Sequence, residues 1–227
     1  MGLFFETVAI QARDRAAGVV PDLEDYISMR RDNSGCRPCW VLIEYTNGLD
    51  LPDEVMEHQI IQSLDETAND VVTWSNVSIY AHILRFPPVL TLDAFQDLFS
   101  DNREQAKGDT YNMIAIVMCY HGMTLQAAVD FVGDVCKKSI DRFNEDRARL
   151  PSWGPEIDAQ VQVYIQGLAD WIVGSLHWSF DSERYFGKEG GKVKRDRIVE
   201  LAPVRVSELA TPANSPVVTE SHGVRVC

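Results

Sequence analysis

Three polar residues at helical spacing form the first candidate site in the sequence. Ser100, Glu104 and Lys107 lie four and three residues apart, so on a helix they share one face. A hydroxyl, a carboxylate and an ammonium group in this order can hold a divalent cation together with an anion bound to it. Oxygen ligands suit Mg²⁺, which usually keeps phosphate oxygens and waters in its coordination shell. The alternative interpretation of an isolated S-x-x-x-E pattern is a solvent-exposed charged face.

The position four residues before Ser100 is the next place for a ligand of this set. Gln96 occupies it and is a poor metal ligand, but deletion of residues 77–96 would bring Asn76 there. The joined text then reads N-D-x-x-S-x-x-x-E-x-x-K without interruption. We therefore interpret Asn76, Ser100 and Glu104 as one set of candidate metal ligands that an insertion separates.

The inserted block of residues 77–96 has the features of a translated intron. It begins with Val77-Ser78, the translation of the common 5′ splice sequence GTAAGT. It ends with Phe95-Gln96, which fits a pyrimidine-rich stretch followed by CAG. Two consecutive prolines inside the block cannot lie within a helix. The hypothesis is an intron retained in the gene model, and the alternative is a genuine loop between two helices. Sequencing the cDNA distinguishes the two.

A second stretch only begins like this motif. Asn69-Asp70-x-x-Thr73 has the right first three residue types, but four residues after Thr73 comes Val77 and not a carboxylate. We interpret it as the preceding turns of the helix that carries Asn76.

Helical periodicity dominates the elements that must position these residues. Apolar residues recur at helical spacing through almost all of the chain up to residue 187, and no segment alternates with period two for long enough to be a strand. The fold class expected is therefore all-α. The expected helices cover residues 4–18, 21–31, 40–45, 51–74, 112–122, 124–149 and 155–178. From residue 188 the composition changes to Gly, Lys and Arg and then to Ser, Thr, Pro and Val, so residues 188–227 are expected to be a disordered tail.

Composition and charge limit the partners. The 227 residues are 45% hydrophobic, which is enough for one domain with a core. The net charge of −13 argues against nucleic acid or an anionic membrane as a partner, because both need a positive surface. The sequence shows neither a membrane-length apolar run nor a signal peptide, so a cytoplasmic location is expected. Nothing in the sequence indicates the oligomeric state.

The joined motif is similar to the second metal-binding motif of class I terpene synthases. The segments LDETANDVVTWSN, DLFS and EQAKGDTYNMIAIVM resemble sesquiterpene synthases of basidiomycete-like fungi. The resemblance covers most of residues 1–187 and implies the C-terminal part of the α-domain, a class I terpenoid synthase helical bundle. It also implies a prenyl diphosphate substrate and, in a complete relative, three Mg²⁺ ions, with Mn²⁺ as a possible replacement. Asn76, Ser100 and Glu104 would be the metal ligands of the second motif.

The segment DLEDYISMRRDNSG resembles the family's broken helix, in which an arginine senses the diphosphate. The resemblance makes Arg31 the sensor, Ser34 the linker and Gly35 the effector whose backbone carbonyl faces the substrate. The residues alone show two arginines before a helix break, which surface charge at a helix C-terminus explains equally well.

The resemblance implies further contacts to the substrate. Arg184-Tyr185 is similar to the family's Arg-Tyr pair that hydrogen-bonds the diphosphate, and Lys107 would add a further contact. The aromatic residues proposed to line the pocket and to stabilise carbocations are Trp74, Phe99 and Trp178. Most aromatic residues in helical stripes belong to the core, and that alternative applies to all three.

One departure from the family affects the expected activity. The aspartate-rich first metal motif has no convincing counterpart, and the sequence resembles the family only from partway through its fold, as a bundle incomplete at the N-terminus. The implied reaction is the ionisation and cyclisation of farnesyl diphosphate to a sesquiterpene with release of diphosphate, impaired in this chain. The alternatives are a non-catalytic helical remnant or interaction protein, and a prenyl chain-elongating transferase, which fits less well because such enzymes use two aspartate-rich motifs.

Overall fold

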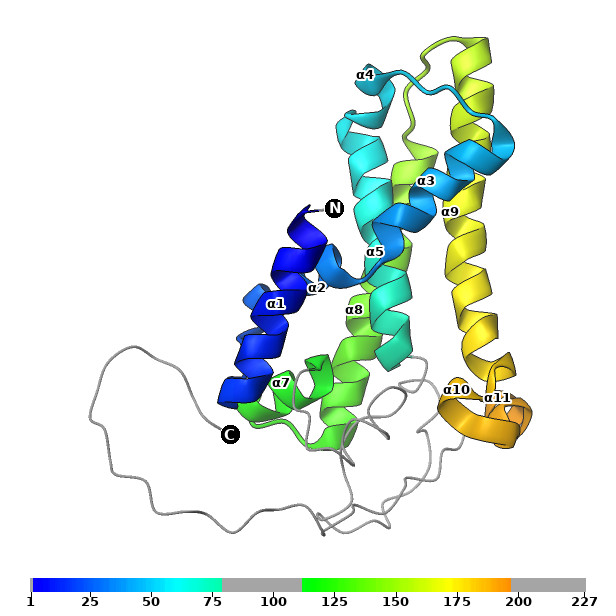
Figure 1. Ribbon diagram of the computed structural model, residues 1–227. Helices are drawn as coiled ribbons and strands as arrows, with labels where there is room; N and C mark the ends of the chain where they lie inside the picture. The colour runs from blue at the N-terminus through cyan, green and yellow to red at the C-terminus, as the bar shows by residue number, and fades with distance from the viewer. Residues whose placement is uncertain (1, 79–111, 197–227) are drawn as a thin grey trace, which may run out of the picture.

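The computed structural model describes residues 2–78 and 112–196, and all regular secondary structure in these two ranges is helical (Figure 1). The first group of helices is α1 (Gly2–Ala17), α2 (Leu23–Asn33), α3 (Cys36–Asn47), α4 (Asp53–Met56) and α5 (Gln59–Ser78). The second group is α7 (Met113–His121), α8 (Leu125–Ala148), α9 (Pro155–Asp181), α10 (Glu183–Phe186), the 3₁₀ helix η2 (Gly187–Glu189) and α11 (Gly190–Asp196). The expected all-α class is confirmed.

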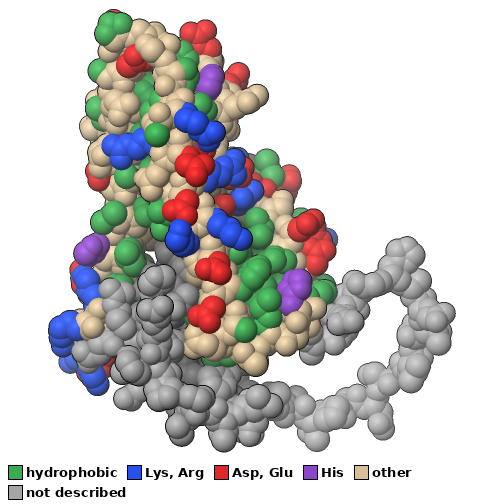
Figure 2. All heavy atoms as spheres, turned by 180° about the vertical axis from the view of Figure 1, so that it is seen from behind, with side chains coloured by type: hydrophobic (Ala, Val, Ile, Leu, Met, Phe, Trp, Pro, Cys, Tyr) green, Lys and Arg blue, Asp and Glu red, His purple; other side chains and the backbone are tan. Residues whose placement is uncertain are grey.

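Three long helices, α5, α8 and α9, form the body of the bundle, and α3 crosses in front of α5 and α9 in Figure 1. Helices α1 and α2 pack together beside this body. Helix α7 meets α8 at a bend of 120°. The face opposite to that of Figure 1 shows Lys and Arg interspersed with Asp and Glu (Figure 2). Such a mixed-charge face is typical of the solvent side of a bundle.

Side-chain caps set the starts of three of these helices, α2, α7 and α8, where the sequence predicts them. The Asp22 carboxylate accepts a hydrogen bond from the backbone N–H of Asp25 at 2.9 Å. The Thr124 hydroxyl accepts one from the N–H of Ala127 at 3.3 Å, at the start of α8. Each cap satisfies an N–H group that the first turn of a helix leaves without a partner.

The buried apolar residues form two clusters, and α5 contributes to both. One lies among α2, α5, α7 and α8 and includes Trp74, while the other lies among α3, α5, α8 and α9 and includes Ile61 and Leu64. Helices α3 and α9 approach closely at Gly167, where an added Cβ would lie only 2.4 Å from Cγ2 of Ile43. A glycine at this position therefore allows α3 and α9 to pack closely in the second cluster.

Two expectations about element boundaries were wrong. The single helix expected over residues 51–74 is divided into α4 and α5, because the turn at Glu57 and His58 interrupts it. The tail expected from residue 188 begins instead with η2 and α11, and α11 packs on α9 with Val193 only 7% exposed. Gly190 makes this packing possible, since an added Cβ there would lie 1.9 Å from the Phe180 carbonyl oxygen. Residues 197–227 lie outside the described part of the chain.

Within residues 2–78 and 112–196, no individual helix is both long and apolar enough to cross a membrane. Helices α7 and α8 meet the length and composition criteria only when taken together across their 120° bend.

Candidate functional site

The break between α2 and α3 is the first element of the candidate site. Gly35 has φ +79°, a left-handed conformation that other residues rarely adopt, and this interrupts the helix. The Ser34 hydroxyl accepts a hydrogen bond from the N–H of Cys36 at 3.2 Å and donates one to the Arg31 carbonyl at 3.4 Å. The expected break at Ser34 and Gly35 is therefore present, and local hydrogen bonds hold its geometry.

Arg31, at the end of α2, is held by two carboxylates of α5. Its Nε and Nη2 atoms donate to the two Asp70 carboxylate oxygens, each at 2.7 Å, and its Nη1 lies 3.0 Å from Oε1 of Glu66. The hydrogen bond with Asp70 raises the pKa of the Arg31 guanidinium above its ordinary value, although burial opposes the shift. The site thus contains a permanently charged fork that suits a carboxylate or a phosphate.

The backbone of the break is tied to α5 as well. Asn69 donates from Nδ2 to the Arg31 carbonyl oxygen at 2.8 Å, and its own Oδ1 accepts the Thr73 hydroxyl at 3.1 Å. Asn69, Asp70 and Thr73 are all buried. The stretch that the sequence led us to interpret only as earlier turns of the helix is therefore a set of contacts to Arg31.

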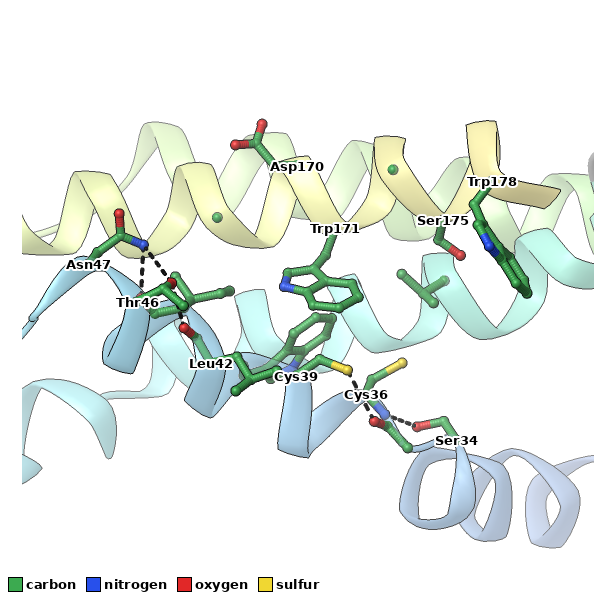
Figure 3. A pocket seen from close by; sticks show the side chains of 16 residues that line it. Ser34, Cys36, Cys39, Leu42, Thr46, Asn47, Asp170, Trp171, Ser175 and Trp178 are labelled. Atoms are coloured by element: carbon green, nitrogen blue, oxygen red, sulfur yellow. Dashed lines mark hydrogen bonds between the residues drawn. The ribbon is translucent and has the colours of Figure 1, made fainter. Parts of the chain in front are cut away.

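A largely apolar cavity of about 790 Å³ lies between α3 and α9. Ser34 and Gly35 line it at the helix break, and Figure 3 shows Trp171 and Trp178 pointing from α9 towards α3. Trp40 completes the aromatic lining and lies edge-on to Trp171, with ring centroids 6.4 Å apart. A cavity of this size and character can enclose a hydrocarbon chain.

The Arg-Tyr pair lies beside one end of this lining. The Tyr185 ring packs edge-on against Trp178, with centroids 5.9 Å apart, and Arg184 Cζ lies 5.6 Å from the Tyr185 centroid. Trp178 remains 51% exposed. The structure therefore brings together Ser34, Gly35 and Trp178 through the cavity, and Arg184 and Tyr185 through Trp178.

Arg31 faces a different cavity. It lines a more polar space of about 540 Å³ on the other side of α3, together with Glu66 and Asn69. The expected sensor and the expected effector therefore lie at one helix break, but their side chain and backbone face different spaces.

The aromatic predictions have mixed outcomes. Trp178 lines the apolar cavity, whereas Trp74 is 1% exposed, belongs to the core and packs near Tyr26 with centroids 6.2 Å apart. Trp74 therefore does not line this cavity; both faces of α5 are buried, and a stripe pattern cannot separate them. Trp40 and Trp171 line the cavity, and nothing in their sequence positions distinguishes them from core residues.

The candidate metal ligands cannot be placed. Ser100, Glu104, Lys107 and Phe99 lie outside the described residues, and so does the side chain of Asn76, although the α5 backbone includes it. In the parts of the chain that the structure describes, no three His, Cys, Asp or Glu residues are grouped to hold a metal ion.

The polar cavity is also lined by a half-buried acid, Asp65. Asp65 Oδ1 accepts the Tyr164 hydroxyl at 2.9 Å. Burial raises the pKa of Asp65 to about 6 and also raises the pKa of Tyr164. The proximity of Glu44 adds to the Asp65 shift, while Tyr164 and Arg37 oppose it.

Comparison with known proteins identifies the family. Residues 1–142 match the model of terpene synthase family 2, C-terminal metal binding. The chain belongs to this terpene synthase family. Membership implies the use of a divalent metal ion, and it confirms the resemblance on which the site residues were proposed.

Curated relatives support the same assignment. The chain is 60% identical to sesquiterpene synthase Agr1 of Cyclocybe aegerita over 200 residues, covering 88% of this chain and 52% of that protein. It is 56% identical to the alpha-muurolene synthase of Coprinopsis cinerea over 203 residues, which is 89% of this chain and 43% of that protein. The chain spans about half the length of the curated relatives it matches.

Solved structures show that the all-α fold is that of class I terpenoid synthases. A linalool/nerolidol synthase from Streptomyces clavuligerus matches with a TM-score of 0.63 at 21% identity, over 78% of this chain and 55% of that one. A germacradien-4-ol synthase from Streptomyces citricolor matches with a TM-score of 0.60 at 22% identity, over 79% and 52%.

Proposed function

We propose that this terpene synthase chain carries the diphosphate-recognition and pocket portion of a sesquiterpene synthase that acts on farnesyl diphosphate. The observation that carries the proposal is the α2–α3 break. The Arg31 side chain faces the polar cavity of about 540 Å³, while Gly35, four residues later, lies at the apolar cavity of about 790 Å³ lined by three tryptophans. A charged group and an apolar space on the two sides of one helix break suit a ligand that spans the break, with an anionic head and a hydrocarbon tail.

In this proposal Arg31 binds and orients the diphosphate. Its planar guanidinium can donate two parallel hydrogen bonds to phosphate oxygens and keeps its charge at any physiological pH. Arg184 and Tyr185 would donate further hydrogen bonds, as would Lys107. Donors that are already oriented stabilise the charge that develops on a leaving diphosphate without a reorganisation cost.

The apolar cavity would hold the hydrocarbon. Trp40, Trp171 and Trp178 present aromatic faces or edges to it, and a cation is attracted to an aromatic face by about 0.5–2 kcal/mol. The largely apolar lining offers few groups that could react with a carbocation, although Trp171 and Trp178 are 38% and 51% exposed. Ser34 and Gly35 line the same cavity at the helix break, so the proposed linker and effector would contact the substrate there.

The divalent metal in the proposal is Mg²⁺, and Mn²⁺ could replace it. A complete site would hold three ions, and Asn76, Ser100 and Glu104 would supply some of their ligands. The metal would stabilise the charge of the leaving diphosphate. Because the described residues contain no group able to hold a metal, we assign no step to it.

The test compares the chain as written with a variant that lacks residues 77–96. The deletion joins Asn76 to Asp97, so we expect it to bind inorganic diphosphate with Mg²⁺ at least about tenfold more tightly in calorimetry. Arg31→Ala in the deletion variant is expected to reverse this gain. Equal binding by the chain and the deletion variant would contradict the proposed metal motif.

A second candidate is a non-catalytic helical protein derived from a terpene synthase. Incubation of the deletion variant with farnesyl diphosphate and Mg²⁺, followed by gas chromatography, separates the two. Sesquiterpene hydrocarbons support the enzyme, and diphosphate binding without any hydrocarbon supports the non-catalytic protein.

A further inference from the structure

The two carboxylates that hold Arg31 differ in burial and geometry. Asp70 contacts the guanidinium with both oxygens at 2.7 Å, and its side chain is only 7% exposed. Glu66 contacts it with one oxygen at 3.0 Å, is 41% exposed, and also lies 3.7 Å from Arg142. A buried bidentate pair is costly to break, whereas an exposed single contact is worth little.

The two carboxylates also use different edges of the guanidinium. Asp70 takes the edge formed by Nε and Nη2, while Glu66 takes a hydrogen of Nη1. Arg31 and Glu66 both line the polar cavity of about 540 Å³, so an anion in that space can reach the edge that Glu66 occupies. An incoming phosphate could therefore replace Glu66 while Asp70 stays in place.

The backbone of Arg31 is fixed independently of its side chain. Asn69 donates to the Arg31 carbonyl at 2.8 Å and is itself held by Thr73 at 3.1 Å. Asn69 holds the backbone carbonyl of Arg31 and Asp70 holds its guanidinium, so α5 fixes the position of both groups. The contact that can then be exchanged is the one between Nη1 and Glu66.

We propose that Asp70 and Asn69 are positioning residues that orient Arg31 for an anionic ligand, and that Glu66 is an internal competitor that the ligand's phosphate displaces. The inference rests on the proposed function, because it takes diphosphate as the ligand. The inference assigns opposite roles to two acids of α5: Asp70 orients Arg31, and Glu66 competes with the ligand for it.

The affinity test uses inorganic diphosphate with Mg²⁺ and the full 227-residue chain. Glu66→Gln removes the competitor together with its partly exposed ion pairs to Arg31 and Arg142, and we expect binding to tighten about two- to fivefold. Asp70→Asn also removes a negative charge, which alone would tighten binding. We expect it instead to weaken binding about two- to tenfold, because the freed Arg31 side chain must be ordered again on binding.

Asp141→Asn is the matched control for charge. Asp141 is an exposed α8 carboxylate that pairs with Lys137 and makes no contact with Arg31. Its removal changes the net charge by the same amount, and we expect no change in diphosphate affinity. Tightening by Glu66→Gln and Asp70→Asn alike would overturn the assignment of Asp70, and an unchanged Glu66→Gln would overturn that of Glu66.

A second measurement does not depend on diphosphate binding. The Arg31 Nε–H group is expected to give a slowly exchanging signal in ¹⁵N NMR of the wild type and of Glu66→Gln, and to lose it in Asp70→Asn. If the wild type binds no diphosphate, the proposed function loses its anion site, while this signal still decides the positioning role. Persistence of the protected signal in Asp70→Asn would overturn that role.

Discussion

The half-buried acid Asp65 makes the stability of this chain depend on pH in a direction opposite to that of most carboxylates. Its pKa rises from 3.8 to about 6 in the folded protein. A group whose pKa is raised by folding stabilises the fold below its unfolded pKa, and this contribution is lost as the pH rises through the folded value. The loss should therefore take place between about pH 4 and pH 6.

The magnitude follows from the shift. The difference between 6 and 3.8 is about 2.2 pKa units, and one unit corresponds to about 1.36 kcal/mol, which gives about 3 kcal/mol. This is an upper value, because Asp65 is only half-buried and lines a cavity. We expect about 1–3 kcal/mol in a measurement.

Asp65→Asn is the informative substitution, because the amide oxygen can still accept the Tyr164 hydroxyl while the charge is removed. Urea denaturation of the wild type and the variant between pH 4 and pH 8 measures the difference in the free energy of unfolding. The free energy of unfolding of the variant should rise relative to that of the wild type from about pH 4 to pH 6, and the difference should stay constant above that range. Parallel curves across the whole range would refute the reasoning, and Asp141→Asn, which removes an exposed carboxylate, serves as the control.

Two further substitutions test the packing and the caps. Gly167→Ala forces a Cβ to within 2.4 Å of Cγ2 of Ile43 and should lower the free energy of unfolding by about 1–3 kcal/mol, and by less in an Ile43→Ala background, where that Cγ2 is absent. Thermal melting of Gly167→Ala in the two backgrounds separates a steric cause from a general loss of stability. Thr124→Ala removes the cap of α8 and should cost about 0.5–2 kcal/mol in urea denaturation, while Thr124→Ser should retain most of the stability. A cost as large for Ser as for Ala would contradict the capping role.

The sequence predicted the helices and the break because their causes are local. The Thr124 cap and the left-handed Gly35 act within a few residues, so pattern and residue type reveal them. The partners of Arg31 could not be predicted in this way, because Asp70 lies 39 residues away and only the packing of α2 on α5 brings them together.

The expectation of a tail from residue 188 was also based on composition alone and could not include contacts with distant residues. Glycines and charged residues after residue 187 are typical of a tail, yet Gly190 and Val193 allow one short helix to pack against α9. The metal motif could be proposed only because its parts match a known pattern when joined across residues 77–96. Its geometry depends on residues 79–111, which lie outside the described part of the chain.

The burial of α5 on two sides has a mechanical consequence for the candidate site. Rotation of this helix would expose either Ile61 in one cluster or Trp74 in the other, so α5 is held in one orientation by both clusters. Asn69 and Asp70 attach the end of α2 to this fixed helix. Movement at the break therefore requires release of these two attachments, while the bundle itself can stay still.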